Sequence, residues 1–252
     1  MTIALSVLGA SGKMGKRVLQ LALNDPSFHI VGATIRSAQS ESMSELPIRL
    51  SSNIKEALAN CDVAIDFTSH EATENHLLAA LDANKPLVIG TTGHTLEQRK
   101  AIEDAAKTIP ILFSPNFSFG IALCLEVASR LGQALYGSCT IDIIETHHIH
   151  KKDRPSGTAL AIAHAIGHGT VVLEDSSPRK KQEILIHAVR SGDVIGEHIL
   201  IFECGHERIE LKHTAHSRDA FAQGALMAAK FLAKQPPGLY ALKDLFARRH
   251  LG

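Results

Sequence analysis

Thr2-Ile-Ala-Leu-Ser-Val-Leu8, followed directly by Gly9-Ala-Ser-Gly-Lys-Met-Gly15, sets the architecture of the first half of the chain. The first segment is a continuous apolar run, which is typical of a strand buried on both faces. Residues 17–23 then have the spacing of an amphipathic helix. The glycines permit a tight turn and let a pyrophosphate approach the backbone at the start of that helix. This order of strand, glycine turn and helix predicts a dinucleotide-binding unit, although Ala10 stands where G-x-G-x-x-G has its first glycine.

The alternation of strand and helix continues along the first half. Strands are expected at 29–35, 63–67, 86–90 and 109–113, and helices at 71–83 and 96–107. This rhythm predicts an α/β fold with a doubly wound parallel sheet that binds ligands at the carboxyl ends of its strands. Three successive strands end in small or polar residues suited to a dinucleotide: Asp66-Phe-Thr-Ser69, Gly90-Thr-Thr-Gly93 and Ser114-Pro-Asn-Phe-Ser118.

The end of the second strand bears on the choice of cofactor. An acid at this place binds the ribose 2′-hydroxyl, whereas a cation accommodates a 2′-phosphate. Arg36 stands here, and the first acid after it is Glu41. We therefore expect NADPH as the preferred cofactor, with NADH possible and with Lys13 as a second cation for the same phosphate. A solvated arginine at a strand end is the alternative interpretation of Arg36.

After Asn116 the pattern changes. Residues 119–135 predict one long helix, and strands are expected at 140–149, 183–190, 197–203 and 208–213. This second, α+β domain should have an open mixed sheet, with a surface loop over 169–182. A helix over 218–234 and a short helix over 239–249 are expected to pack back on the first domain. The domain boundaries are thus 1–118 plus 219–252, and 119–218.

Chemistry is expected in Glu145-Thr-His-His-Ile-His-Lys-Lys-Asp-Arg-Pro-Ser-Gly-Thr158, where an apolar run gives way to three histidines and two lysines. Alternation along the strand places Glu145 and His147 on one side and His148 on the other, so the two adjacent histidines cannot form one clamp. Ser156 is expected to cap the next helix.

The free backbone N–H groups of that helix, near Gly157 and Thr158, favour a bound anion. Together with Lys151 they predict a site for a small acid. Two other interpretations stay open, namely a solvated basic turn and a metal site with His148 and His150 as ligands. The spacing matches no usual zinc pattern and there is no pair of nearby cysteines, so we expect no metal.

Composition limits the partners of the chain. Its 252 residues suffice for two domains, and Lys plus Arg equals Asp plus Glu, 26 each, which gives no overall field for nucleic acid or an anionic membrane. The chain shows no signal peptide and no stretch long enough to span a membrane, so a cytoplasmic protein is expected. The four cysteines form no C-x-x-C, so we expect no disulfide and assume a reducing compartment.

Several motifs, taken in chain order, resemble one known family. They are the glycine turn, Asp66-Phe-Thr68, Gly90-Thr-Thr-Gly93, Asn116-Phe-Ser118, Glu145-Thr-His-His-Ile-His-Lys151 with Pro155-Ser-Gly-Thr158, and Arg190-Ser-Gly-Asp193. The combination resembles the 4-hydroxy-tetrahydrodipicolinate (dihydrodipicolinate) reductases of bacterial diaminopimelate and lysine biosynthesis. The resemblance implies a Rossmann-type domain over 1–118 plus 219–252, a substrate-binding and tetramerisation domain over 119–218, and NADH or NADPH as hydride donor.

The resemblance also implies roles for single residues. His147 and Lys151 would transfer protons, with Lys151 as the donor, and His148, Gly157 and Thr158 would hold a cyclic dicarboxylate substrate. Besides Arg36, the cofactor would be lined by Gly9, Ala10, Ser11, Gly12, Lys13, Met14, Gly90, Thr91, Thr92, Ser114, Pro115, Asn116 and Phe117.

The glycine turn alone is compatible with other functions. One is another NADP-dependent two-domain dehydrogenase of a small acid, and another is a non-catalytic regulator that binds NADPH. A regulator would need Gly12 and Arg36 but neither His147 nor Lys151.

Overall fold

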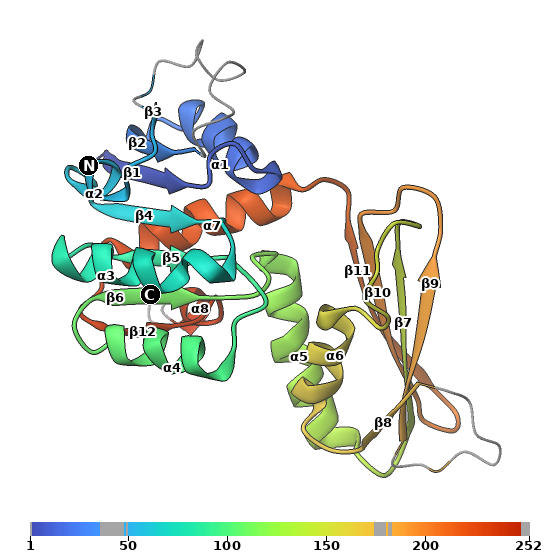
Figure 1. Ribbon diagram of the computed structural model, residues 1–252. Coiled ribbons are helices and arrows are strands. Elements are labelled where there is room, and N and C mark those ends of the chain that lie inside the picture. Colours follow the sequence, from blue (N-terminus) through green and yellow to red (C-terminus); the bar gives the residue numbers. More distant parts are fainter. Residues whose placement is uncertain (1, 36–47, 49, 174–179, 181–182, 248–252) are drawn as a thin grey trace. The chain divides into compact units, whose positions relative to one another are not determined.

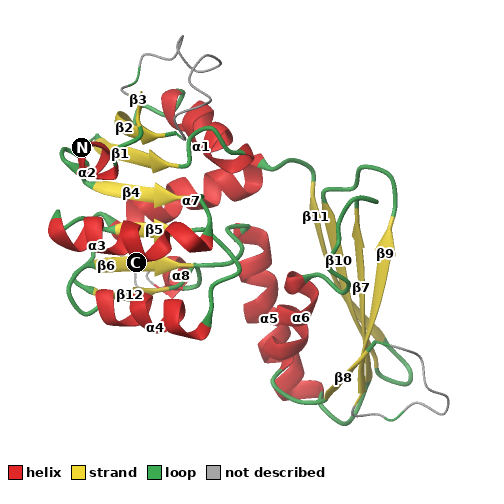
Figure 2. Cartoon of the chain, in the orientation of Figure 1, coloured by secondary structure: helices red, strands yellow, loops and turns green. Residues whose placement is uncertain are grey.

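The computed structural model describes residues 2–35, 48, 50–173, 180 and 183–247, and the chain divides into two compact units. Unit 1 comprises Met1–Phe117 and Asp219–Gly252, and unit 2 comprises Ser118–Arg218. Each unit has a sheet and helices of its own (Figure 1, Figure 2). The segment after residue 218 therefore belongs to the same unit as the start of the chain.

The sheet of unit 1 has seven strands in the order β12-β6-β5-β4-β1-β2-β3, and every pairing is parallel. This confirms the predicted doubly wound parallel sheet. The order changes direction between β1 and β4, and such a switch point opens a crevice at the carboxyl ends of the strands. The strands are β1 (Ile3–Leu8), β2 (Phe28–Thr34), β3 (Leu50–Ser51), β4 (Val63–Asp66), β5 (Leu87–Ile89), β6 (Pro110–Phe113) and β12 (Gly238–Tyr240).

Helices cover both faces of this sheet (Figure 1). Helices α2, α3 and α4 contribute Leu58, Leu77 and Ile102 to a buried cluster on one face. On the other face α1 packs against α7, and Arg17 Nε of α1 donates to Asp219 Oδ1 of α7 at 2.6 Å. The helical elements are α1 (Lys13–Leu23), α2 (Ile54–Leu58), the 3₁₀ turn η2 (His70–Ala72), α3 (Thr73–Asp82), α4 (Leu96–Ala105), α7 (Asp219–Leu232) and α8 (Asp244–Ala247).

The prediction of one helix over 239–249 is wrong. Pro236 and Pro237 follow the end of α7, and the chain then adds β12 beside β6, with Leu239 paired to Ile111. Of the described residues after β12, those of the short α8 (Asp244–Ala247) are helical. A strand of three residues gives too few positions to show a period of two, and its free edge partner is visible only once the sheet is assembled.

Unit 2 holds a mixed sheet in the order β11-β10-β7-β9-β8, as predicted for the second half of the chain. The pairs β11·β10 and β10·β7 are antiparallel, and β7·β9 and β9·β8 are parallel. Helices α5 (Phe119–Leu135) and α6 (Gly157–Ile166) pack together on one face, over buried Ile143, Ile186 and Phe202. The strands are β7 (Thr140–His147), β8 (Thr170–Val172), β9 (Glu183–Arg190), β10 (Gly196–Glu203) and β11 (Arg208–Ala215).

Strand β8 lies inside the segment that was expected to be a loop over 169–182. Thr170, Val171 and Val172 pair with the start of β9, because two β-branched valines fit the free edge of that strand. Within the described residues, no helix combines the length and the apolar character that a membrane span needs.

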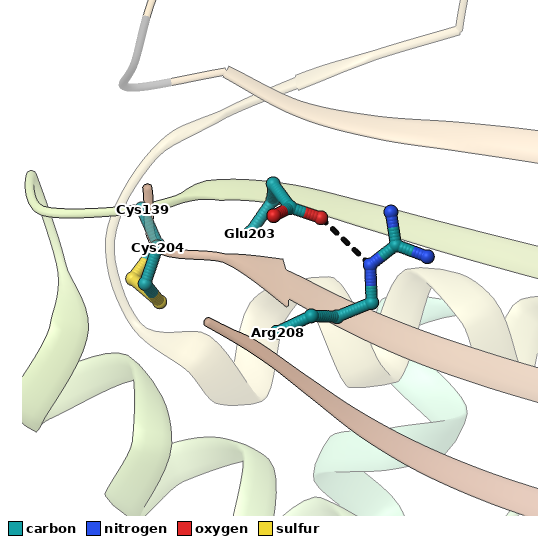
Figure 3. The surroundings of a disulfide bond; sticks show 4 residues. All are labelled: Cys139, Glu203, Cys204 and Arg208. Carbon is teal, nitrogen blue, oxygen red and sulfur yellow. Dashed lines mark hydrogen bonds and ion pairs between the residues drawn. A yellow bond between two sulfur atoms is a disulfide. The ribbon is translucent and has the colours of Figure 1, made fainter. Parts of the chain in front are cut away.

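The expectation of no disulfide is wrong, because Cys139 and Cys204 are bonded to each other (Figure 3). Thr140 of β7 and Glu203 of β10 form the last pair of an antiparallel ladder, and the two cysteines come next on each strand. They are 65 residues apart in sequence, so no local spacing indicates the bond. The cysteine pattern therefore gives no support to the assumed reducing compartment.

We expect the unreduced protein, unfolded in denaturant, to titrate two thiols, those of Cys61 and Cys124, and to titrate four after reduction. Cys204→Ser should lower the free energy of unfolding by about 2–4 kcal/mol, because it removes a cross-link that restricts the unfolded chain. Urea unfolding measures this loss, and the variant and the wild type should agree once reductant is present. Four thiols in the unreduced protein would contradict the bond.

Candidate active site

Unit 1 has a hollow of about 810 Å³ at the carboxyl ends of β1, β2 and β4. Of the predicted cofactor residues, Gly9, Ser11, Gly12 and Lys13 line it. Gly12 is the N-cap residue of α1 and has no side chain to accept a hydrogen bond. The first N–H groups of this helix are therefore open to an anion such as a pyrophosphate. The hollow therefore has the form and the donors that a dinucleotide phosphate requires.

The turn tolerates no side chain at two of its glycines. Gly9 has φ +81°, and a Cβ there would lie 2.9 Å from the carbonyl oxygen of Phe67. A Cβ at Gly15 would lie 2.1 Å from the carbonyl oxygen of Gly9. Ala10 is fully buried, and neither it nor Met14 lines the hollow.

The other predicted cofactor residues follow β5 and β6 at the same edge of the sheet but do not line this hollow. Phe67, which lines the hollow, contacts two of them. A Cβ at Gly90 would lie 2.1 Å from a ring carbon of Phe67, and the Phe67 and Phe117 rings meet edge to face with their centroids 5.7 Å apart. These residues are Gly90, Thr91, Thr92, Ser114, Pro115, Asn116 and Phe117. Arg36, the predicted partner of a 2′-phosphate, lies outside the described residues.

A buried carboxylate at this edge holds a histidine that sequence analysis missed. Asp66 Oδ1 accepts from Thr68 N at 2.8 Å and from Thr68 Oγ1 at 2.6 Å, and Asp66 Oδ2 lies 2.7 Å from His76 Nδ1. His76 lines the hollow from α3. The polar strand end at Asp66 was visible in the sequence, but its pairing with a residue of the following helix depends on how that helix packs.

In unit 2, Glu145 is the centre of a buried group of side chains on the inner face of the sheet. Its Oε2 lies 2.5 Å from His147 Nδ1, and its two oxygens accept from Arg190 Nη1 and Nη2 at 2.9 Å each. Oε1 also accepts from the backbone N–H of Ser156 at 3.1 Å. We call Glu145, His147, Arg190 and Ser156 the Glu145 cluster.

The placement of Glu145 and His147 on one side of their strand is confirmed, and so is Ser156 as the cap of α6. The strand ends at His147, however, and His148 and His150 lie in the turn beyond it. Ser156 Oγ accepts from Ala159 N at 3.1 Å, as a helix cap does. Arg190 belongs to the Arg190-Ser-Gly-Asp193 motif of the sequence, but its contact with Glu145 depends on the pairing of β9 with β7.

The charges in this cluster balance. Burial raises the pKa of Glu145, but the hydrogen bonds and charges of Arg190 and His147 outweigh it, so that the net shift lowers the pKa and the carboxyl group is ionised. Burial lowers the pKa of His147, and Glu145 only partly offsets this, so the ring is neutral near pH 7.

Two histidines lie beside the cluster in matching arrangements. His198 Nε2 lies 3.1 Å from Ser156 Oγ, and His213 Nε2 lies 3.1 Å from Ser118 Oγ, where each serine caps a helix. Each serine oxygen also accepts the backbone N–H of its helix cap, and the tautomer of the histidine decides which partner donates in the serine–histidine bond. Sequence analysis missed both pairs, since the partners lie 42 and 95 residues apart.

The loop after β7 carries the remaining predicted residues. Lys151 Nζ lies 2.8 Å from Asp153 Oδ1, so a carboxylate stands beside the predicted proton donor. Nothing lies within 4 Å of the position that a Cβ of Gly157 would take, and the Gly157 backbone N–H is hydrogen-bonded to the Asp153 carboxylate. His148 Nδ1, Arg190 Nε and His198 Nδ1 are buried without a hydrogen-bond partner.

The metal interpretation lacks a third ligand in the part of the chain that the structure describes. The rings of His148 and His150 lie 6.2 Å apart, and no set of three or more His, Cys, Asp or Glu side chains is grouped to hold an ion among these residues.

Two family models match the chain. The one described as dihydrodipicolinate reductase, N-terminus, matches residues 3–117, and the one described as dihydrodipicolinate reductase, C-terminus, matches residues 120–246. A protein of Akkermansia muciniphila named 4-hydroxy-tetrahydrodipicolinate reductase is 41% identical over 260 residues, covering 99% of this chain and 100% of the relative. A protein of the same name from Caldanaerobacter subterraneus is 42% identical, covering 97% and 98%.

Solved structures agree with these matches. The dipicolinate-bound dihydrodipicolinate reductase of Paenisporosarcina sp. TG-14 is similar with a TM-score of 0.81 and 25% identity, covering 97% of this chain and 99% of that one. A probable dehydrogenase from Thermotoga maritima has a TM-score of 0.67 at 12% identity, over 96% and 92% of the two chains, and shows a shared fold.

Stability should fall as the pH is lowered through the weakly acidic range. Burial lowers the pKa of His198 from 6.5 to about 4, so between these values the unfolded chain binds a proton that the folded protein does not. Between about pH 7 and about pH 5 the loss should reach about 2 kcal/mol. Urea unfolding at about pH 7 and about pH 5 measures it. His198→Gln should flatten this dependence, and the exposed His206→Gln should not; equal slopes in all three proteins would contradict the assignment.

Proposed function

The chain belongs to the dihydrodipicolinate reductase family, and we propose that it catalyses the NAD(P)H-dependent reduction of 4-hydroxy-tetrahydrodipicolinate to tetrahydrodipicolinate in diaminopimelate and lysine biosynthesis. It is an oxidoreductase that uses a nicotinamide dinucleotide. The observation that carries the proposal is the Glu145 cluster, which fixes His147 and Arg190 beside the start of α6 in the same stretch that carries Lys151.

The substrate is proposed to bind through His148, Gly157 and Thr158. A carboxylate at the N-terminus of α6 would gain roughly 0.3–1 kcal/mol from the helix dipole, and more where it is partly buried. The solved Paenisporosarcina enzyme, which is similar to this chain, has dipicolinate bound. Arg190 and His198 add nitrogen atoms on the same inner face of the sheet.

Lys151 is proposed to be the proton donor. The 4-hydroxyl group of the substrate leaves as water, a bound reduced nicotinamide would supply a hydride to the ring, and the ring nitrogen that receives the electrons must gain a proton. The Lys151 ammonium can give this proton, and Asp153 at 2.8 Å holds it in place. His147, neutral and fixed by Glu145, would orient the lysine or share its proton. A positioned acid of this kind contributes roughly 10²–10⁴ in rate.

The preferred cofactor is proposed to be NADPH. In the sequence Arg36 comes two residues after the end of β2, a position at which a cation favours a 2′-phosphate, and Lys13 in the hollow adds a second positive charge. NADH would bind through the same phosphate-binding turn, with lower affinity.

A homotetramer and a cytoplasmic location are also proposed. The face of the unit 2 sheet that is turned away from α5 and α6 carries half-buried Ile144, Ile199 and Ile201 and exposed Val189, which suits contacts with a second copy. The cytoplasm is where a biosynthetic enzyme meets reduced dinucleotide. Sedimentation analysis would test the oligomeric state.

The reaction itself is tested by NADPH oxidation with the freshly generated condensation product of aspartate semialdehyde and pyruvate. We expect rapid oxidation with this mixture and none with the semialdehyde or the keto acid alone. Oxidation with a keto acid or an amino-acid precursor would instead favour another small-acid dehydrogenase. NADPH binding without any oxidation would favour a regulator.

Replacing the two loop residues should separate turnover from binding. Lys151→Ala should lower kcat by roughly 10²–10⁴, because it removes the proton donor. Thr158→Ala should mainly raise KM, because it removes a contact to the bound carboxylate. Steady-state kinetics measure both effects, and the exposed neighbour substitution Lys152→Ala is the matched control. A near-normal kcat for Lys151→Ala would remove Lys151 from the donor role.

Cofactor preference should depend on Arg36. Arg36→Ala should raise the Kd for NADPH by roughly 10-fold or more, because a charge-assisted contact to phosphate is lost, and should leave the Kd for NADH nearly unchanged. Calorimetric titration of both cofactors measures this. Arg99→Ala, an exposed substitution on α4, serves as control. Equal weakening of the two cofactors by Arg36→Ala would contradict the assignment.

A further inference from the structure

Glu145 is the one member of its cluster that contacts all the others. It is fully buried, and its two oxygens accept four hydrogen bonds, from the His147 ring, both terminal nitrogens of Arg190 and the backbone of Ser156. These donors come from β7, β9 and the start of α6. A single carboxylate thus fixes two side chains and one helix end with respect to each other.

The contact with Glu145 also fixes where the hydrogen of His147 lies. An ionised carboxylate only accepts hydrogen bonds, so Nδ1 of His147, at 2.5 Å, must carry the hydrogen. In a neutral ring Nε2 then has a free lone pair. Gly196 of β10 leaves room on this side, since a Cβ there would lie 3.1 Å from His147 Nε2.

Arg190 depends on the same carboxylate. Besides Glu145, its Nη1 donates to the Val189 carbonyl and its Nη2 to the Asp153 carbonyl, at 2.6 Å each. Its Nε is buried without a partner. Removing the negative charge of Glu145 would leave a buried guanidinium with backbone carbonyls only, which costs free energy and frees the side chain to turn.

We propose that Glu145 is a positioning residue of the reduction: it holds His147 as the Nδ1–H tautomer with Nε2 free, and it anchors Arg190 and the start of α6 around the substrate. This inference rests on the proposed function. It implies that His147 in its resting form accepts a hydrogen bond at Nε2, so the proton gained by the substrate nitrogen comes from the Lys151 ammonium, which is left as the amine.

The tautomer can be tested in the wild-type protein without any substitution. Long-range ¹H–¹⁵N correlation spectra of histidine-labelled protein distinguish the two neutral tautomers, and His147→Gln identifies the signals. We expect His147 to be protonated at Nδ1 and bare at Nε2 at neutral pH. A ring protonated at Nε2 would overturn the proposal, whatever the activity of the protein.

Two substitutions then test the link to turnover. Glu145→Gln should lower kcat on the order of 10²-fold, because loss of an orienting carboxylate allows the wrong histidine tautomer. Glu145→Asp, which keeps the charge, should recover part of this loss. The control is Asp142→Asn on the opposite face of β7. Asp142 Oδ1 lies 2.9 Å from His187 Nε2, so this substitution also removes the carboxylate of a carboxylate–histidine pair. It should keep kcat within about 2-fold when the oligomeric state is unchanged.

The pH profile separates positioning from a merely structural role. The charged and titratable groups around His147 are Glu145, Lys151, Arg190 and His198. Of these, only Glu145 raises the pKa of His147. Glu145→Gln should therefore move the acid limb of kcat/KM to lower pH, whereas general loosening of the fold would lower the rate without moving it. An unshifted limb with wild-type kcat would overturn the proposal.

These outcomes are distinct from failure of the proposed function. If the wild type does not reduce the condensation product, the reaction assignment fails, while the tautomer of His147 is still decided by the spectra.

Discussion

A buried carboxylate must be surrounded by donors, and this requirement at Glu145 organises unit 2. Further along the same inner face the side chains are apolar, with Ile141, Ile143 and Leu200 in the core. One charge in such surroundings would be costly by several kcal/mol if it were unpaired. Arg190, His147 and the backbone of Ser156 at the start of α6 donate hydrogen bonds to this carboxylate, and these bonds hold the three groups next to each other.

The constraint in unit 1 is steric instead. The end of β4 approaches the glycine turn so closely that a Cβ at Gly9 would meet the Phe67 carbonyl oxygen at 2.9 Å. The chain can make this approach only because Gly9 adopts a positive φ without penalty. The result is a backbone surface at the start of α1 that a phosphate can reach, with Lys13 beside it.

Much of the candidate site could be read from local patterns, and the missing parts share one cause. The sequence predicts Ser156 as a helix cap and His147 on the same side of its strand as Glu145, because capping and strand alternation depend on neighbours in sequence. Arg190, His198 and Asp153 were not given their roles, since their partners are set by strand register or loop conformation. His198 stands opposite Glu145 only because β10 pairs with β7 in one register. The disulfide between Cys139 and Cys204 follows from the same register.

The order of strands and helices, the doubly wound parallel sheet, the glycine turn and the helix start after Pro155 are all encoded in stretches of a few residues. Hydrophobic period, turn residues and caps act over one or two turns of the chain, so these features can be recognised without coordinates. The packed structure adds what joins distant segments: the hydrogen bonds from Arg190 and Ser156 to Glu145, the Asp66–His76 pair, the Cys139–Cys204 bond and the edge strand β12. Each of these depends on strand register or on helix packing, and both are set only when distant segments of the chain pack together into the hydrophobic cores.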